Sequence, residues 1–220
     1  MNQGSLIFLG VLATMALSWS GMILTPQLQI GQQAPVVQEE LGDIYPKDRS
    51  GLAHQGAEVY RSLGCAACHS QQVGAVAGDI PRYGKRITVA ADYLFDRPVQ
   101  LGSVRTGPDL ANIGVRQTNA NWHLLHLYNP KLTAAGSTMP AYPFLFDTVF
   151  LKPGQTPAAD SLVAGEKVIV PRKKALQLAG YLLSLKSEGS LFEAPIPAPR
   201  TNSMATAANA PAAATNAPAK

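Results

Sequence analysis

The chain has 220 residues, which is enough for one domain of ordinary size with extensions, since domains commonly run to ~100–150 residues. Charged residues make up only 15% of the chain, apolar residues make up 46%, and the formal net charge is +4. The basic residues form no cluster interleaved with aromatics, so nucleic-acid binding has no support in the sequence.

The first predicted element is an uncharged apolar run from Ser5 to Leu24. As a helix it would span about 30 Å, one hydrocarbon thickness. An uncleaved single-span anchor and a cleaved secretory signal are both open interpretations. A signal peptide has a basic start and an apolar core of only ~7–15 residues, so we favour a transmembrane anchor over residues 1–25. Trp19 near its outer end is typical of a membrane interface.

The next segment, residues 26–50, carries proline and glycine at intervals and predicts an irregular stalk, or a stretch that docks along a partner. Leu52 to Leu63 then has apolar residues at helical spacing, and Ser50 is available as its cap. Gly64 turns the chain out of this predicted helix. We expect one domain over residues 51–190.

The motif Cys65-Ala66-Ala67-Cys68-His69 follows directly. Two thiols separated by two residues and followed at once by histidine form the attachment signature of c-type haem. Each thiol can form a thioether bond, and His69 would be the proximal iron ligand. A redox pair or a structural disulfide would leave His69 unexplained, and a zinc site would need further soft ligands that two cysteines do not supply. Such haem attachment takes place outside the cytoplasmic membrane in bacteria, which predicts a periplasmic domain.

Residues 71–103 have no long helical period and form a predicted loop-rich excursion. Its basic residues predict either a solvated loop or a surface for a partner or for haem propionates; they are Arg82, Lys85, Arg86 and Arg97. Arg105 after the excursion is a candidate propionate partner through its bidentate fork. The Gly-Pro turn at Pro108 can bring a backbone carbonyl to the imidazole Nδ1–H, which would fix the ring.

A short helix is predicted over residues 121–129 and ends before Pro130. Trp122 is on its partly buried face. His123 and His126 are three residues apart, so a metal site is one interpretation, although a pair without a third ligand is more often structural. Hydrogen bonding to a propionate or to a partner subunit is the favoured role for one of them.

Met139, in the segment Ser-Thr-Met-Pro, is the candidate for the second axial ligand. Among the five methionines it alone follows the haem signature in a turn-rich, folded context, and Pro140 stiffens its loop. Methionine and histidine together ligate the iron of many c-type cytochromes. A core methionine is the alternative, in which case His54 is the best substitute ligand.

The C-terminal part of the chain contains one further predicted helix. Residues 147–171 predict an exposed polar insertion, and residues 172–186 an amphipathic helix that crosses the first one at Gly180. Residues 191–220 are mostly Ala, Pro, Asn and Thr and predict a disordered tail, because such a composition buries too little apolar surface. The predicted fold class is mainly α: a cytochrome c domain with long loop insertions on a single N-terminal transmembrane helix.

Several segments in order carry a more specific resemblance. The chain between about residues 63 and 145 contains CHSQQV, RYG, YLFDRPVQLGSVRTGPDLANIG, NWHLLHLYNP and STMPAYPFL. This series resembles the membrane-anchored mono-haem subunit of cbb3-type cytochrome c oxidases, the FixO/CcoO family. Two positions depart from the family pattern: Gly74 replaces a basic residue, and Phe144 replaces a tryptophan.

The resemblance implies a class I cytochrome c domain with one covalent haem c. It implies that Cys65 and Cys68 attach the haem, that His69 and Met139 ligate the iron, and that haem-proximal motifs contain Arg105, Pro108 and Trp122. It also implies two partners: a catalytic haem b/b3-copper subunit and a further cytochrome c subunit. The iron would be six-coordinate, so we expect electron transfer and no active site on this chain.

Other functions stay open at this level. They are a membrane-tethered electron carrier, the mono-haem subunit of a nitric oxide reductase-like complex, and a redox or ligand sensor in which Met139 leaves the iron. The long loops favour a permanent partner over a free carrier.

Overall fold

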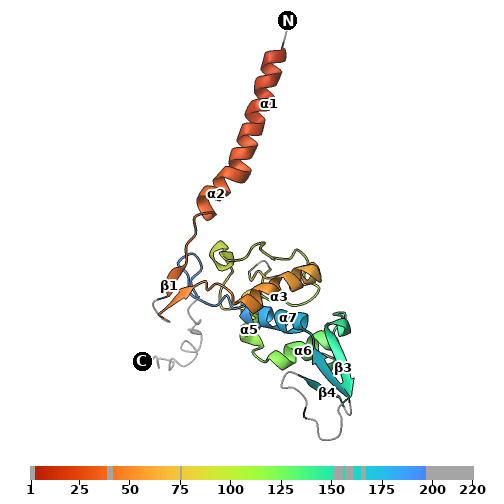
Figure 1. The fold of residues 1–220 in the computed structure, drawn as a ribbon. Helices are drawn as coiled ribbons and strands as arrows, with labels where there is room; N and C mark the ends of the chain where they lie inside the picture. The colour runs from red at the N-terminus through yellow and green to blue at the C-terminus, as the bar shows by residue number, and fades with distance from the viewer. Residues whose placement is uncertain are drawn as a thin grey trace, which may run out of the picture.

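The computed structural model describes residues 3–38, 42–74, 76–150, 156, 161–164 and 167–196 (Figure 1). The helices are α1 (Gly4–Trp19), α2 (Thr25–Ile30), α3 (Gly51–Ser62), α4 (Asp79–Tyr83), α5 (Ile113–Arg116), α6 (Ala120–Tyr128) and α7 (Lys173–Ser184). One π segment, η1 (Ser20–Leu24), joins α1 to α2. Single 3-10 turns are η2 (Cys65–Ala67), η3 (Ala90–Tyr93), η4 (Pro130–Leu132) and η5 (Pro143–Leu145).

Two small antiparallel sheets accompany the helices. Strands β1 (Val36–Gln38) and β2 (Asp43–Tyr45) form a hairpin, and the second sheet has the order β3-β5-β4. Its strands are β3 (Phe146–Phe150), β4 (Leu162–Ala164) and β5 (Lys167–Pro171). The architecture is therefore a mixture of helix and strand, where the sequence predicted mainly helix.

The predicted exposure of the insertion at 147–171 is confirmed for residues 147–150 of β3 and is wrong for β5. Val168 and Ile169 are buried, and β5 pairs with β3 along its whole length from Phe146↔Pro171 to Phe150↔Lys167. The run Lys-Val-Ile-Val-Pro is rich in β-branched residues, which favour a pleated, half-buried surface. The sheet lies at the end of the domain away from α1 (Figure 1).

The apolar N-terminal helix extends away from the rest of the chain (Figure 1). It runs without interruption from Gly4 to Ile30, 27 residues, and is long and apolar enough to cross a membrane. Its side chains are exposed, including Leu17 and Met22. The helix continues past Leu24, where the sequence predicted an irregular stalk to begin, because Pro26 lies in the first turn of α2, where a proline is tolerated.

The stalk is also more ordered than predicted. The β1–β2 hairpin pairs Val36 with Tyr45, and Tyr45 Oη donates a 2.5 Å hydrogen bond to Asp92 Oδ1. Arg86 is only 1% exposed and donates to both Asp92 oxygens at 2.7 and 2.9 Å. The expectation of a solvated or partner-facing side chain was therefore wrong for Arg86. It is buried with Asp92, which also accepts from Tyr45 of the stalk, so these three residues connect the stalk to the domain.

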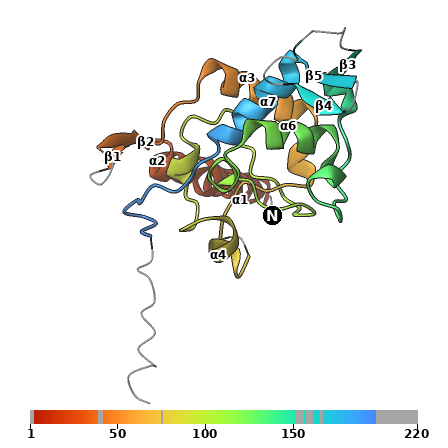
Figure 2. The same ribbon diagram turned by 90° about the horizontal axis from the view of Figure 1, so that it is seen from below.

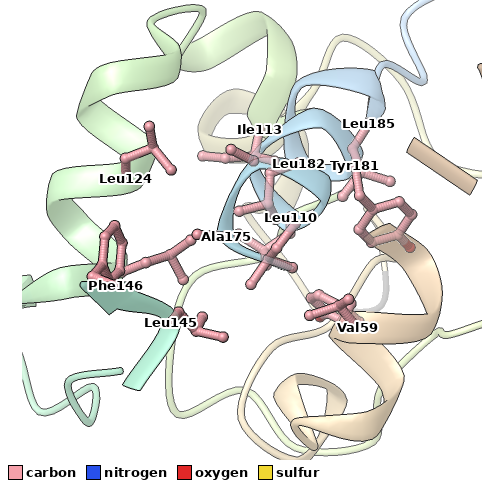
Figure 3. Close-up of a cluster of buried hydrophobic side chains, with 14 of the residues drawn as sticks. Val59, Leu110, Ile113, Leu124, Leu145, Phe146, Ala175, Tyr181, Leu182 and Leu185 are labelled. Atoms are coloured by element: carbon pink, nitrogen blue, oxygen red, sulfur yellow. The ribbon is translucent and has the colours of Figure 1, made fainter. Parts of the chain in front are cut away.

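The core lies where α3 and α7 cross, with α6 and η5 packed beside them (Figures 2 and 3). The helices approach so closely at Gly56 that an added Cβ would lie 1.9 Å from the carbonyl oxygen of Gln177. Around this crossing lie buried apolar side chains, among them Val59, Leu110, Ile113, Leu124, Leu145, Phe146, Ala175, Tyr181 and Leu182. All three predicted domain helices are present within two residues of their predicted bounds, although Ser50 caps α3 without a side-chain hydrogen bond.

The described part of the predicted tail, residues 191–196, is anchored. Leu191 and Ala194 are buried and form an isolated antiparallel bridge. Burial of Leu191 holds this part of the tail on the domain, whereas Phe192 is exposed. The rest of the predicted disordered tail, residues 197–220, lies outside the described residues.

Candidate cofactor site

Helix α3 ends directly before the cysteine motif. Gly64 adopts a left-handed conformation (φ 72°), which glycine takes at little cost, and η2 follows at once. The amide N–H groups of Cys68 and His69 both donate to the carbonyl of Cys65, at 3.1 and 3.0 Å. Both thiols are free; Cys65 is half-buried and Cys68 is exposed. Burial raises the pKa of the Cys65 thiol to about 11, so it is protonated at neutral pH.

The imidazole of His69 is fixed by a backbone carbonyl. Its Nδ1 lies 2.8 Å from the oxygen of Pro108, the contact that the Gly-Pro turn predicted. A carbonyl only accepts hydrogen bonds, so Nδ1 carries the proton and Nε2 keeps its lone pair for a metal. Gly107 makes the approach possible: an added Cβ there would lie 2.3 Å from Cε1 of the ring.

His69 and Met139 line the same cavity, which is partly open to solvent. Its walls are mostly apolar and come from α3, the 108–113 segment, α6 and α7: Tyr60, Cys65, Pro108, Leu110, Ile113, Trp122, Leu127, Leu178 and Leu182. An adjoining hollow of about 550 Å³ is bordered by Cys68 and by the loop that bears Met139. The loop is anchored where Tyr142 N–H donates to Leu127 O at 2.9 Å.

These residues fit a haem. Cofactor sites are typically concave, with mostly apolar walls and a few placed polar groups. Here an imidazole nitrogen and a thioether sulfur face one apolar cavity beside two thiols. Such nitrogen and sulfur donors are typical axial ligands of haem iron.

Trp122 lines the cavity and organises two histidines. Its ring stacks on His126 (centroids 4.8 Å apart, 7° between planes) and meets His123 edge-on. His126 Nδ1 shares a hydrogen bond with the hydroxyl of Thr133, while His123 Nε2 donates to Gln117 O at 2.8 Å. Within the described ranges, no group of three or more His, Cys, Asp or Glu could hold a metal ion. The structure therefore gives each histidine an internal partner.

His123 predicts a measurable pH dependence of stability. Burial lowers its pKa below the usual 6.5, even though the hydrogen bond to Gln117 acts in the opposite direction. Below pH ~6.5 the histidine binds a proton in the unfolded chain but not in the folded chain. The free energy of unfolding therefore decreases as the pH is lowered, by at most ~1.4 kcal/mol per pH unit. His123→Gln keeps a donor but does not titrate, so urea unfolding from pH 7.5 to 5.5 should show a shallower decline. An unchanged decline would contradict the assignment; the remaining slope belongs partly to His126, whose pKa is also lowered by burial.

Arg105 does not line the cavity or the adjoining hollow; its guanidinium binds other protein groups. It donates to Ser70 Oγ at 2.7 Å, Asp79 Oδ1 at 2.6 Å and Gln72 O at 3.0 Å. Sequence reasoning did not identify Asp79 or Asp109 as parts of this site. No local pattern marks them, because the fold brings them to Arg105 from separate segments.

His54 does not line the cavity of His69 and Met139. It borders a separate cleft with Arg49, Glu58 and Asp96, on the outer side of α3. The structure therefore does not bring the predicted substitute ligand to the cavity. Tyr60 borders the cavity, and the centroid of its ring lies 5.3 Å from that of the Tyr181 ring.

Together, the apolar cavity, its imidazole and its thioether define a protein that holds one large metal-bearing cofactor. The family model described as cytochrome c oxidase, mono-heme subunit/FixO matches residues 2–180. The chain belongs to this family of haem-binding subunits of cytochrome c oxidase complexes. No curated protein matches the chain significantly.

Proposed function

We propose that this chain relays electrons through one covalent c-type haem to the catalytic haem–copper subunit of a cbb3-type oxidase. The observation that carries the proposal is the placement of His69 and Met139 on one apolar cavity, beside both thiols of the cysteine motif. A further cytochrome c subunit would be the second partner. Membership of an oxidase-subunit family supports this role over that of a free carrier.

The proposed roles follow from the donor atoms. Cys65 and Cys68 would each add across one vinyl group, with sulfur bonding one carbon and hydrogen the other. His69 Nε2 and Met139 Sδ would occupy the two axial positions, and Trp122 would pack at the edge of the cavity. The haem supplies a one-electron couple, and Met/His ligation raises its potential, which suits a donor to an oxidase.

The fold proposal is a class I cytochrome c domain, supported by α3 running into the cysteine motif and crossing the C-terminal α7. Residues 1–25 would be the transmembrane anchor, 26–50 the stalk and 51–190 the haem domain, with the tail from 191. The domain would lie on the periplasmic side, where c-type haem is attached.

Purification of the full chain in mild detergent tests haem attachment and association with an oxidase. We expect covalent haem on denaturing gels and co-purification of a subunit that contains haem b and copper. Recovery of a haem-bearing lone monomer would contradict the subunit role. Haem that stays on the chain in denaturing gels after Cys65→Ala and Cys68→Ala together would contradict covalent attachment.

Met139→Leu tests the sixth ligand. Leucine keeps the apolar volume, so folding and covalent haem should be retained at a cost below ~1.5 kcal/mol. The near-infrared sulfur-to-iron band of the ferric protein should disappear, because leucine has no sulfur. Met15→Leu on the exposed membrane helix is the matched control and should keep the band. A band that survives in Met139→Leu would show that another residue is the ligand.

A further inference from the structure

Two chain segments lie side by side next to the His69 imidazole. Gly107 N–H donates to Cys68 O at 2.9 Å, and Leu110 N–H donates to Ser70 O at 2.8 Å. Pro108, whose carbonyl accepts from His69, lies between these two bonds in the sequence. The position of that carbonyl therefore depends on how firmly the two segments are joined.

Arg105 joins the segments at one end. Its Nε donates to the Ser70 hydroxyl at 2.7 Å, and one Nη donates to Gln72 O at 3.0 Å. Its other Nη reaches Asp79 Oδ1 at 2.6 Å, and Asp79 Oδ2 in turn accepts from the amide of Gly74 at 3.1 Å. The guanidinium thus binds three acceptors on two stretches of chain, residues 70–72 and Asp79, which its rigid planar fork favours.

Asp109 joins the same segments on the other side of Pro108. Its side chain is fully buried, and Oδ2 accepts from the Ser70 hydroxyl at 2.6 Å and from Gln72 N–H at 2.8 Å. Arg105 Nη2 lies 3.4 Å from the same oxygen. Ser70 Oγ accepts from Arg105 and donates to Asp109, and it therefore links two residues that lie on either side of the Gly107–Pro108 turn.

The cluster is largely removed from solvent. The side chains of Arg105, Asp79 and Asp109 are 18%, 4% and 0% exposed. Burial would raise the pKa of Asp79, but hydrogen bonds from Arg105 and from backbone amides together lower it below its usual value. Hydrogen bonds between ionised groups are short and strong in such surroundings, so the cluster resists displacement.

We propose that Arg105 is a positioning residue: it holds the Pro108 carbonyl against His69 Nδ1 and so keeps the proximal imidazole strongly basic. A more basic axial ligand stabilises ferric iron, so the cluster lowers the reduction potential relative to a loosely held histidine. This inference rests on the proposed function, in which His69 ligates the iron. It replaces the expectation that the guanidinium serves a propionate.

Arg105→Lys in the full chain is the test, because lysine keeps the charge but cannot span the three acceptors. We expect covalent haem to remain and the reduction potential to rise. Loss of a residue that hydrogen-bonds to a metal ligand commonly lowers metal affinity or activity about tenfold or more. A tenfold change in the equilibrium constant of a one-electron couple corresponds to about 59 mV. The His69 Nδ1–H signal in nuclear magnetic resonance should exchange with solvent about tenfold faster.

Arg61→Lys is the matched control, since Arg61 pairs with Glu58 on the exposed face of α3. It should match wild type in both measurements. Potential and exchange that are unchanged in Arg105→Lys would overturn the proposal, as would a lowered potential or an equal shift in the control. If Arg105→Lys does not accumulate, Ser70→Ala removes the shared hydroxyl and is decided by the same two measurements.

Different measurements test the proposed function and the positioning role of Arg105. A wild-type chain without covalent haem would refute the proposed function. The exchange rate of His69 Nδ1–H in that same protein, compared with Arg105→Lys, would still decide whether Arg105 positions the ring.

Discussion

Gly107→Ala is expected to leave the protein folded but to displace the imidazole of His69. The added Cβ would lie 2.3 Å from Cε1 and 2.7 Å from Nδ1 of His69. Since the atoms in conflict belong to the end of one side chain, the ring can rotate away at little cost in stability. That rotation breaks the 2.8 Å contact with Pro108 O and removes Nε2 from its place on the cavity wall.

The measurement is the absorption spectrum of the haem-loaded protein together with its urea unfolding curve. We expect the low-spin spectrum of a six-coordinate haem in wild type and its loss in Gly107→Ala, with an unfolding free energy within ~1 kcal/mol of wild type. Gly51→Ala, where nothing lies within 4 Å of the added atom, should keep the spectrum. A normal spectrum in Gly107→Ala would show that the ring tolerates the methyl group in place.

Gly56→Ala should have the opposite outcome and destabilise the whole domain. Its added Cβ would lie 1.9 Å from the carbonyl oxygen and 2.6 Å from the carbonyl carbon of Gln177, so the conflict is with the backbone of α7. The two helices must separate, which loosens the packing around Val59 and Tyr181. Overpacking commonly costs ~1–3 kcal/mol, and we expect about 3 kcal/mol or more because backbone must move.

Urea unfolding of the two variants on α3 separates helix propensity from packing. Alanine favours an exposed helix by up to ~1 kcal/mol over glycine, so Gly51→Ala should be neutral or slightly stabilising. Gly56→Ala should be strongly destabilised even though the same propensity gain applies. Equal stability of the two variants would show that the helix crossing adapts freely.

The elements that local patterns specify were predicted well. Helices α3, α6 and α7 follow from apolar residues at helical spacing, and the Gly-Pro turn predicted the contact of Pro108 with His69. Strand β5 was missed although its β-branched run was visible, because strand pairing depends on a partner, β3, about twenty residues away. Prolines and glycines nearby made the whole segment resemble a loop.

Long-range charge pairing explains the remaining differences. Arg86 and Arg105 look alike in the sequence, as basic residues in or beside a loop-rich stretch. One is buried against Asp92 and the stalk, and the other binds Asp79 beside the cofactor cavity. A burial of this kind depends on acceptors from several segments, and no local periodicity encodes it.

The β1–β2 hairpin limits the distance between the domain and the N-terminal apolar helix. Fully extended, the twenty residues 31–50 would reach ~70 Å at up to ~3.6 Å per residue. Pairing of Val36 with Tyr45 brings these two positions to neighbouring strands, ~5 Å apart, so the ten residues between and including them add almost no reach. Only about ten residues then remain as a linker, at most ~36 Å long. Tyr45 is itself hydrogen-bonded to Asp92. In the membrane-anchored chain that we propose, a linker this short would keep the domain near the bilayer surface, where its effective concentration toward a neighbour in the same membrane would be high.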